Sequence, residues 1–317
     1  MKYKILVVGL GALGKRHLSS ILNSSLPLDI YCYDINPNCL DSFTFEDKFN
    51  NKSLCIISNF AEISSEIDFA LFSMTSKGRR SVFDLLVNKV KVKNILFEKV
   101  LFQKIEDYSH VSSELRRLNI KSWVNCARRQ MDSYQALRTE LKHAKEMYID
   151  VSGSEWGLAC NAIHEIDLIE FLSGCTETNI KKLDLLPIIG ESKRSGFKEV
   201  YGSIYGNCGK CKEFSITCLH DSNSPSVLHI STDEFQYIIL EGQNKLIKIS
   251  TDKYEISDFV MPYQSHMTQY VIEDILLRGT CKLTTYEESS RMHLEFIKPL
   301  IEFFENHGME KGLCPIT

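Results

Sequence analysis

Short apolar runs alternate with amphipathic stretches through the first 125 residues of the chain. The apolar runs have the length of strands, and they occupy residues 4–8, 29–33, 54–57, 68–73, 94–97 and 121–125. Helical spacing follows the first run as far as Leu22 and recurs over residues 81–87 and 104–118. Strands that alternate with helices in this way predict a parallel, doubly wound sheet.

The pattern changes after Asn125. Helices are predicted over residues 128–143, 155–174 and 263–277, and a strand over residues 146–152. Turn-rich pieces at residues 206–209 and 221–225 help to separate five further predicted strands, over residues 200–205, 213–219, 227–232, 235–241 and 245–250. The last helix opens with two overlapping capping boxes and is predicted to bury Phe296, Ile297, Leu300, Ile301 and Phe304.

Three glycines with the spacing G-x-G-x-x-G stand where the first strand meets the first helix: Gly9, Gly11 and Gly14. In a Rossmann unit the first glycine makes the tight turn, the second lets backbone approach a pyrophosphate, and the third lets helix pack closely on strand. The phosphates then lie on the backbone N–H groups at the helix start, which here belong to Ala12 and Leu13. The alternative is a glycine-rich turn that binds no ligand.

An acidic residue, Asp34, ends the second predicted strand, twenty residues after the third glycine. A carboxylate at this place accepts a hydrogen bond from a free ribose 2′-hydroxyl and repels a 2′-phosphate. The sequence therefore predicts NAD as the cofactor and favours it over NADP.

These patterns together predict an α/β chain of two domains, which suits a length of 317 residues. Residues 1–124 are predicted to form an N-terminal Rossmann domain that binds NAD. Residues 125–317 are predicted to form an α+β domain with a large open, mostly antiparallel sheet, which binds substrate and mediates oligomerisation. Packing of the last helix back on the first domain is left open as an alternative.

Two polar loops follow late strands of the first domain. Ligands of doubly wound sheets bind at the carboxyl ends of strands, so Ser73, Thr75 and Ser76 are candidate cofactor residues; a plain turn is the alternative. Glu98 and Lys99 end the next strand, at the level where a nicotinamide is expected. A lysine there can hydrogen-bond a substrate hydroxyl or accept its proton, whereas the alternative is a solvated surface pair.

The helix predicted over residues 155–174 carries a second set of candidates. Cys160, His164 and Asp167 share one face of it at i, i+4 and i+7, with Asn161 beside them. A histidine can shuttle a proton near neutral pH, although helix histidines are often only packed or capped. Arg129, next to Arg128 at a strand-to-helix junction, is a candidate for binding an anionic or polyhydroxylated substrate, and exposed arginines at helix starts are the alternative.

Composition and charge exclude several classes of protein. The formal net charge of −4 and a pI near 6.2 give no basic field for nucleic acid or acidic membranes. No apolar run approaches the roughly 18 residues that span a bilayer, and no signal peptide is recognised, so the sequence predicts a cytoplasmic protein.

The eleven cysteines are expected to be reduced thiols. Cys208 and Cys211 form a C-x-x-C that leaves zinc open as an alternative, but a second pair is missing and no metal is predicted.

A Rossmann fingerprint, a Glu-Lys at a late strand end, a helical His164-x-x-Asp167 and a following open sheet occur in this order, and Thr285-Tyr286-Glu287-Glu288-Ser289 comes near the end. The chain resembles the Gfo/Idh/MocA oxidoreductases over nearly its whole length. The resemblance implies an NAD(P)-binding Rossmann domain, an α/β domain whose sheet mediates dimers or tetramers, and a substrate among sugars, cyclitols and nucleotide-sugars. It also implies that Lys99 is the lysine of the family's E-K-P motif and His164 the histidine of its D-x-x-x-H motif.

Two positions depart from this pattern. The proline after the lysine is Val100 here, so Lys99 keeps the family's orientation only if the cis peptide bond at that place is kept. The aspartate four residues before His164 is Cys160, and a neutral thiol cannot stabilise an imidazolium as a carboxylate does. Asn161 is a candidate to hydrogen-bond substrate instead. Residues 158–164 and 192–197 resemble a branch of the family that acts on surface-polysaccharide sugars.

The leading expectation is an NAD-dependent dehydrogenase or reductase acting on CH–OH groups of a sugar, cyclitol or nucleotide-sugar, in which Lys99 polarises the oxygen and His164 exchanges the proton. Predicted substrate contacts are Arg129, Tyr134, Cys160, Asn161 and Arg194. A homodimer or homotetramer is expected through the C-terminal sheet. Two alternatives stay open: a catalytically weak NAD-bound sensor or regulatory protein on the same fold, and a reductase of C=N or conjugated C=C bonds.

Overall fold

A computed structural model describes residues 2–36, 38–39 and 51–317 of the chain. Two compact units make up the structure. Unit 1 contains Met1–Phe102, Glu106–Ala127 and Tyr263–Glu287, and unit 2 contains Gln103–Ile105, Arg128–Pro262 and Glu288–Thr317. Each unit therefore combines segments that lie far apart in the sequence.

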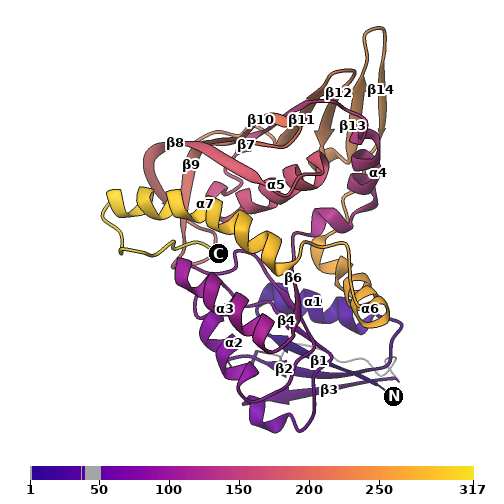
Figure 1. The fold of residues 1–317 in the computed structure, drawn as a ribbon, viewed down its shortest axis with the longest axis vertical. Helices are drawn as coiled ribbons and strands as arrows, with labels where there is room; N and C mark the ends of the chain where they lie inside the picture. The colour runs from indigo at the N-terminus through magenta and orange to yellow at the C-terminus, as the bar shows by residue number, and fades with distance from the viewer. Residues whose placement is uncertain (1, 37, 40–50) are drawn as a thin grey trace. The chain divides into compact units, whose positions relative to one another are not determined.

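Unit 1 is built on a six-stranded sheet in which every pair of neighbouring strands is parallel. The strand order is β3-β2-β1-β4-β5-β6 (Figure 1). The strands are β1 (Tyr3–Val8), β2 (Leu28–Tyr33), β3 (Lys52–Ile57), β4 (Phe69–Phe72), β5 (Asn94–Phe97) and β6 (Lys121–Val124). The order reverses between β1 and β4, and in an open α/β sheet such a reversal creates a crevice at the carboxyl ends of the strands. The predicted doubly wound sheet is confirmed.

Helices cover both faces of this sheet (Figure 1). On one face α1 (Ala12–Leu22) and α6 (Thr268–Arg278) enclose a core that includes Leu18, Ile21 and Ile272. On the other face lie α2 (Arg79–Val87) and α3 (Ile105–Arg117). Aromatic rings fill that layer, with neighbouring centroids 5.1 to 6.3 Å apart, and they belong to Phe72, Phe83, Phe97, Phe102, Tyr108 and Tyr286. Buried strands with apolar side chains on both faces are what a parallel sheet requires.

Unit 2 contains an eight-stranded sheet with the order β14-β13-β12-β11-β7-β10-β9-β8. Its neighbours are antiparallel except for the parallel pair β7 and β10. The strands are β7 (Met147–Ser154), β8 (Thr178–Glu191), β9 (Lys198–Cys208), β10 (Cys211–Leu219), β11 (Val227–Thr232), β12 (Gln236–Leu240), β13 (Lys245–Ile249) and β14 (Tyr254–Asp258). The predicted large, mostly antiparallel sheet is confirmed.

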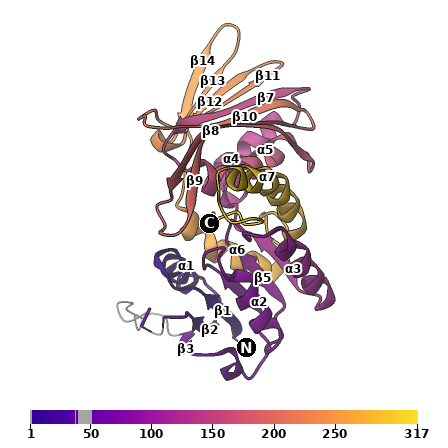
Figure 2. The ribbon, with the colours of Figure 1, turned by 90° about the vertical axis from the view of Figure 1, so that its left-hand side faces the viewer.

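One face of the eight-stranded sheet is covered by helix α5 (Leu158–Ser173), which packs on β7, β9 and β10. Every residue of α5 except Asn161 is buried. Helix α4 (Asp132–Leu141) and helix α7 (Tyr286–Asn306) contact α5 in turn. Figure 2 shows these helices on one side of the sheet, and none of the described helices covers its other face. A helix between a sheet and other helices is buried all round, so the polar side chains of α5 need partners within the protein.

Two strands were not predicted, β8 and β14, and both lie at edges of the sheet. Strand β8 is mostly exposed, carries adjacent lysines, and bends at an irregularity around Pro187. Charges and proline are common on edge strands because they discourage pairing with other chains, but they also remove the apolar alternation that marks a strand. All residues of β14 are exposed, but Tyr254 and Ile256 alternate with polar residues, so a strand signal was present here and was missed.

Several predicted boundaries are wrong. The helix predicted over residues 263–277 is a 3-10 turn, Gln264–Met267, followed by α6 from Thr268. The helix predicted over residues 155–174 begins only at Leu158, because Glu155 and Gly157 have positive φ values of 52° and 85°. The turn predicted over residues 206–209 is shorter, since β9 continues to Cys208. The helix predicted over residues 128–143 is a 3-10 turn, Ala127–Gln130, followed by α4.

The predicted burial of the last helix is confirmed for Phe296, Ile297, Leu300, Ile301 and Phe304. No described helix is long and apolar enough to cross a membrane.

Candidate active site

The three glycines lie where β1 ends and α1 begins, and the first and third have a steric reason to be glycine. Gly9 has a φ of +89°, and a Cβ on it would lie 2.6 Å from the backbone nitrogen of Met74. A Cβ on Gly14 would lie 2.0 Å from the carbonyl oxygen of Gly9. A Cβ on Gly11, in contrast, would have nothing within 4 Å. The first and third glycines therefore permit close packing, and the second faces open space.

That open space adjoins the start of α1, whose first N–H groups are available to an anion. Gly11 is the N-cap, no side chain caps the helix, and its first turn, which begins with Ala12 and Leu13, holds no acidic residue. Helix N-termini favour negative charge because their first N–H groups point outward along the axis. The residues present fit the pyrophosphate of a dinucleotide.

Asp34 lies at the carboxyl end of β2, beside the glycine loop. One carboxylate oxygen accepts from the backbone N–H of Leu10 at 2.5 Å, and the other accepts from the N–H of Asn36 at 2.9 Å. The side chain stays half-buried. Asp34 thus helps to fix the glycine loop and retains exposed surface at the strand end where a ribose is expected.

The predicted cofactor loop after β4 is hydrogen-bonded to the backbone of the glycine loop. The hydroxyl of Ser73 donates toward the carbonyl oxygens of Gly9, at 2.6 Å, and Val8, at 3.1 Å. Ser76 is buried, and Thr75 is half-buried. Ser73 therefore holds the backbone of the glycine loop.

Glu98 is buried at the end of β5, and its carboxylate is paired with His17 of α1 at 3.0 Å. The side-chain amide of Asn125 donates to the same carboxylate oxygen at 2.5 Å. Burial by itself raises the pKa of Glu98, but the hydrogen bond and charge of His17, together with Asn125, hold it below its usual value. Half-buried Lys99 follows, and the Lys99–Val100 peptide bond is cis, as in the first of the two cases that the sequence left open.

His17 was not among the predicted site residues. Its other ring nitrogen, Nδ1, lies 2.7 Å from the hydroxyl of Thr268 in α6, and the side chain has no exposed surface. The sequence signal was the place of His17 three residues after Gly14, but helical spacing alone assigns such a residue to packing.

In unit 2, Glu199 caps the start of α5, which the sequence did not indicate. Its carboxylate accepts from the backbone N–H groups of Ala159, at 2.9 Å, and Cys160, at 3.4 Å. The side-chain amide of Asn161 donates to the carbonyl of Trp156 at 2.8 Å and so ties down the turn before the helix. Capping by a carboxylate satisfies N–H groups that have no partner within the helix.

Cys160 is buried in the first turn of α5, with its sulfur 3.6 Å from the hydroxyl of Ser192. Burial, and then the charge of Glu199, raises the pKa of Cys160 to about 11. The residue is therefore a neutral thiol at neutral pH, as expected for a side chain that replaces a carboxylate without its charge.

His164 lies one turn further along α5 with 6 % of its surface exposed. Asp167, on the same face, accepts from the Nε of Arg129 at 2.8 Å, and its carbonyl accepts from the Nη2 of Arg129 at 3.2 Å. The arginine predicted to contact substrate is thus held by this aspartate, with 15 % of its side chain exposed.

Tyr134, a predicted substrate contact, has no exposed surface. Its ring packs edge-on against Phe259, and its hydroxyl donates to Glu241. A side chain that offers no surface cannot touch a substrate in this conformation, so we omit Tyr134 from the proposed substrate set. Periodicity could not show this, because the partner lies 107 residues away.

Tyr134 belongs to a buried charge cluster around Arg128. The guanidinium lies 2.7 Å from Glu241 and 3.0 Å from Glu165 of α5. Burial and the charge of Glu241 raise the pKa of Glu165 to about 7 against the opposing effect of Arg128. Burial also raises the pKa of Glu241, but Arg128 and the hydroxyl of Tyr134 outweigh it and lower that pKa. The cluster is best described as an Arg128–Glu241 ion pair beside a Glu165 whose pKa lies near neutral pH.

Arg194 lies in the exposed turn between β8 and β9, where its backbone N–H donates to the hydroxyl of Ser192 at 3.4 Å. The same hydroxyl group lies near the sulfur of Cys160. The turn that carries Arg194 and the first turn of α5 are therefore neighbours within unit 2.

Comparison with solved structures shows similarity over nearly the whole chain. An oxidoreductase from Agrobacterium radiobacter in complex with NAD+, L-tartaric acid and magnesium is 14% identical at a TM-score of 0.71, with 93% of this chain and 94% of that chain covered. The UDP-N-acetylglucosamine 3-dehydrogenase GnnA from Acidithiobacillus ferrooxidans is 12% identical at 0.70, with 94% and 96% covered. A super-repressor mutant of Gal80p from Saccharomyces cerevisiae is 13% identical at 0.75, with 96% of each chain covered.

The chain has the Gfo/Idh/MocA fold. The resemblance inferred from the motifs is thereby confirmed at the level of the fold. No protein-family model and no curated protein matches the sequence itself. At identities of 12 to 14% the similar structures establish architecture, and the chemistry has to be argued from this chain's own residues.

In this Gfo/Idh/MocA fold the C-x-x-C pair lies in the hairpin between β9 and β10. Cys208 and Cys211 are buried and face each other across the turn, and burial raises the pKa of Cys208 to about 11 and that of Cys211 to about 12. Among residues 2–36, 38–39 and 51–317, no group of three or more His, Cys, Asp or Glu side chains is arranged to hold a metal ion.

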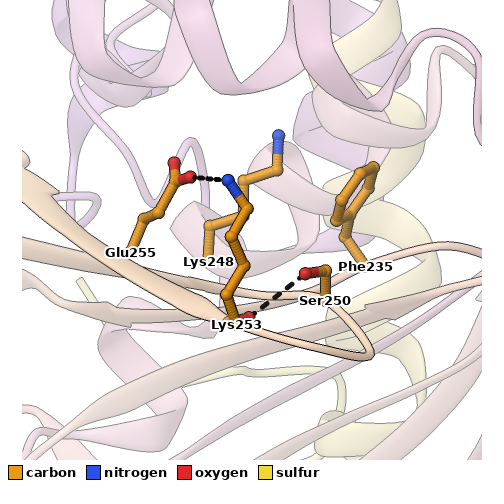
Figure 3. A pocket seen from close by; sticks show the side chains of 5 residues that line it. All are labelled: Phe235, Lys248, Ser250, Lys253 and Glu255. Atoms are coloured by element: carbon orange, nitrogen blue, oxygen red, sulfur yellow. Dashed lines mark hydrogen bonds and ion pairs between the residues drawn. The ribbon is translucent and has the colours of Figure 1, made fainter.

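A hollow near the β13–β14 hairpin contains none of the predicted site residues (Figure 3). It is lined by Phe235, Lys248, Ser250, Lys253 and Glu255. The ammonium of Lys253 pairs with Glu255 at 2.5 Å, and that of Lys248 lies 4.3 Å from the centroid of the Phe235 ring. These side chains satisfy one another, so we assign no ligand to this hollow.

The charge cluster predicts a pH dependence of stability. A pKa of Glu165 raised from 4.5 to about 7 means that the folded chain binds a proton more tightly than the unfolded chain. The contribution of Glu165 to the free energy of unfolding is fully present below pH 4.5. Roughly 3 kcal/mol of this stabilisation is lost as the pH rises through about 7. We expect Glu165→Gln to lose less stability than the wild type between pH 5 and pH 8, measured by urea unfolding.

The matched control is Glu140→Gln in α4, where the carboxylate is half-exposed and pairs with Lys248 at 2.9 Å. It should keep the pH dependence of the wild type. An equal loss of stability with pH in wild type and Glu165→Gln would show that Glu165 is ionised in the folded chain.

Proposed function

We propose that the protein is an NAD-dependent oxidoreductase that transfers a hydride between the nicotinamide and a secondary alcohol or ketone of a sugar, cyclitol or nucleotide-sugar. The observation that carries this proposal is the glycine loop, in which Gly11 faces open space at an uncapped helix start. Two of the similar structures support it: one holds NAD+ with a hydroxy acid, and one is a nucleotide-sugar dehydrogenase. A role in surface-polysaccharide sugar metabolism is part of the proposal.

In the proposed reaction, the glycine loop binds the cofactor, and Lys99 and His164 act on the substrate. The bound nicotinamide supplies the hydride acceptor or donor. In the oxidative direction, the ammonium of Lys99 holds the substrate oxygen, and His164 accepts the hydroxyl proton as the carbon–oxygen bond becomes a carbonyl. In the reductive direction His164 returns that proton.

The proposed substrate contacts are those that retain access. Arg194 is exposed, and Asn161 is half-buried beside the first turn of α5. Cys160 contributes a neutral, weakly polar surface there. Arg129 is retained as a charged group whose orientation Asp167 fixes. Charge and hydrogen-bond donors of this kind suit a polyhydroxylated or anionic substrate.

A second candidate function is a catalytically weak NAD-bound regulatory protein. The observation that favours it is that a neutral thiol, Cys160, stands four residues before His164, where the family's motif has a carboxylate. Gal80p, a repressor by its description, has a similar structure. NAD binding without turnover on a broad panel of sugars, cyclitols and nucleotide-sugars would favour this candidate.

Replacing either catalytic candidate tests the reaction. We expect Lys99→Ala and His164→Ala to lower turnover by about 100-fold or more, the scale of lost acid–base assistance, with NAD affinity changed by less than about threefold. Turnover is followed as NADH absorbance and NAD affinity by calorimetry. Lys104→Ala and His143→Ala, both at exposed positions, are the matched controls. Wild-type turnover in both Lys99→Ala and His164→Ala would refute the assignment.

Cofactor choice is tested at Asp34. We expect Asp34→Ala to lower NAD affinity by about tenfold, because a charge-assisted bond to the ribose is lost, and to leave NADP affinity unchanged or improved. The ratio of the two affinities is the measurement, because any loosening of the glycine loop affects both cofactors alike. Asp29→Ala, on the same strand but paired with Lys2 and Ser53, is the control. An unchanged ratio would contradict the NAD preference.

Oligomerisation is proposed through the uncovered face of the eight-stranded sheet. Tyr148 lies half-exposed between the buried Met147 and Ile149, and Ile256 is 60 % exposed on β14. We expect the wild type to be a dimer or tetramer in light scattering, and Tyr148→Glu with Ile256→Glu to dissociate it, because burying these charges is costly. Leu277→Glu, exposed on α6, is the control. A monomeric wild type would contradict this proposal.

A further inference from the structure

Arg79 is the first residue of α2, and its side chain is completely buried. The sequence analysis gave it no role, and the proposed reaction does not use it. Fully buried arginines are rare because removing a guanidinium from water is costly unless its N–H groups find acceptors. The acceptors that Arg79 has found are therefore informative.

The guanidinium donates to backbone carbonyls from two loops. Its Nη1 nitrogen lies 2.7 Å from the carbonyl oxygen of Glu98, 2.5 Å from that of Val100 and 2.7 Å from that of Leu101. Its Nη2 nitrogen donates to the carbonyl of Met74. Nη1 carries two N–H groups, so at least one of them is shared between carbonyls. The three Nη1 partners surround Lys99 in the sequence.

The loop that carries Lys99 is therefore held on two sides. Arg79 holds the carbonyls of the residues before and after Lys99, and His17 with Asn125 holds the carboxylate of Glu98. The Nη2 nitrogen of the same guanidinium donates to the carbonyl of Met74, whose backbone lies against Gly9. One buried cation thus joins the Lys99 loop to the loop that supports the glycine turn.

We propose that Arg79 is a positioning residue for Lys99. By fixing three carbonyls around that residue, its guanidinium sets the direction in which the Lys99 side chain leaves the backbone. The catalytic meaning of this role rests on the proposed function, in which Lys99 holds the substrate oxygen. The structural claim itself requires neither NAD nor a substrate.

The planar shape of arginine accounts for the residue type. A guanidinium offers five N–H groups in a fixed fork and can reach carbonyls on two loops at once. A lysine ammonium keeps the charge but donates from a single nitrogen, so it can serve part of this set. Methionine fills a similar volume and donates nothing.

The test measures the reactivity of Lys99 in the full chain without cofactor or substrate. Lysines are modified by reductive methylation across a pH series, and the rate at Lys99 is read by mass spectrometry beside the rates at Lys104 and Lys121. We expect Arg79→Met to change the rate at Lys99 at least threefold and to shift its pH profile, with Lys104 and Lys121 unchanged. Arg79→Lys should restore part of the wild-type behaviour.

The matched control is Arg80→Met, the next residue of α2, whose guanidinium pairs with Asp84 at 2.8 Å on the surface. It should leave Lys99 at its wild-type rate. Folding of each variant is checked by thermal unfolding. If Arg79→Met does not fold, Arg79→Lys replaces it as the deciding variant, and its rate at Lys99 is expected to differ from that of the wild type, with Lys104 and Lys121 unchanged.

A wild-type rate and pH profile at Lys99 in folded Arg79→Met, or in Arg79→Lys where only that variant folds, would overturn the proposal. Equal changes at all three lysines would also overturn it, because they indicate general loosening of unit 1. These outcomes are independent of turnover, so a wild-type protein that oxidises no sugar would refute the proposed function and leave this result standing.

Discussion

Unit 1 depends on the approach of two glycines at the start of α1, where a Cβ on Gly14 would lie 2.0 Å from the carbonyl oxygen of Gly9. No side chain fits there, so helix and strand meet backbone to backbone. The same turn presses against Met74, and Arg79 binds the Met74 carbonyl together with those flanking Lys99. The phosphate-binding turn and the candidate catalytic lysine are consequently parts of one connected backbone scaffold. A displacement at either end has to be accommodated through a buried guanidinium.

Unit 2 has to accommodate buried charge, because α5 is buried almost completely and still carries ionisable groups. Each of its acidic side chains is matched with a cation or donor: Asp167 with Arg129, Glu165 with Arg128, and Glu170 with Arg291 and Thr178. Buried carboxylates without such partners would be strongly destabilising. The arginines that surround α5 are therefore explained first by the charges of this helix, and only secondarily by a substrate.

Much of the fold was predictable, because the signals that specify it are local. The glycine spacing predicted the turn at Gly9, and apolar periodicity predicted both sheets. Strand β8 was missed because an exposed edge strand with Pro187 needs no apolar alternation. Site residues were missed for another reason. Arg79 and Glu199 bind backbone groups that lie about 20 to 40 residues away, and such partners leave no pattern in the sequence. Tyr134 failed as a substrate contact because its burial depends on Glu241, far along the chain.

Cys160 also affects the balance of charge at the start of α5. A carboxylate at position 160 would have lain within reach of Glu199, which already occupies the N–H groups at the start of α5. Two ionised carboxylates so close together in a buried place would raise each other's pKa. Cys160 avoids that repulsion and leaves Glu199 as the cap. The residue one turn before His164 in α5 is consequently a neutral thiol, and the negative charge at the start of this helix belongs to Glu199.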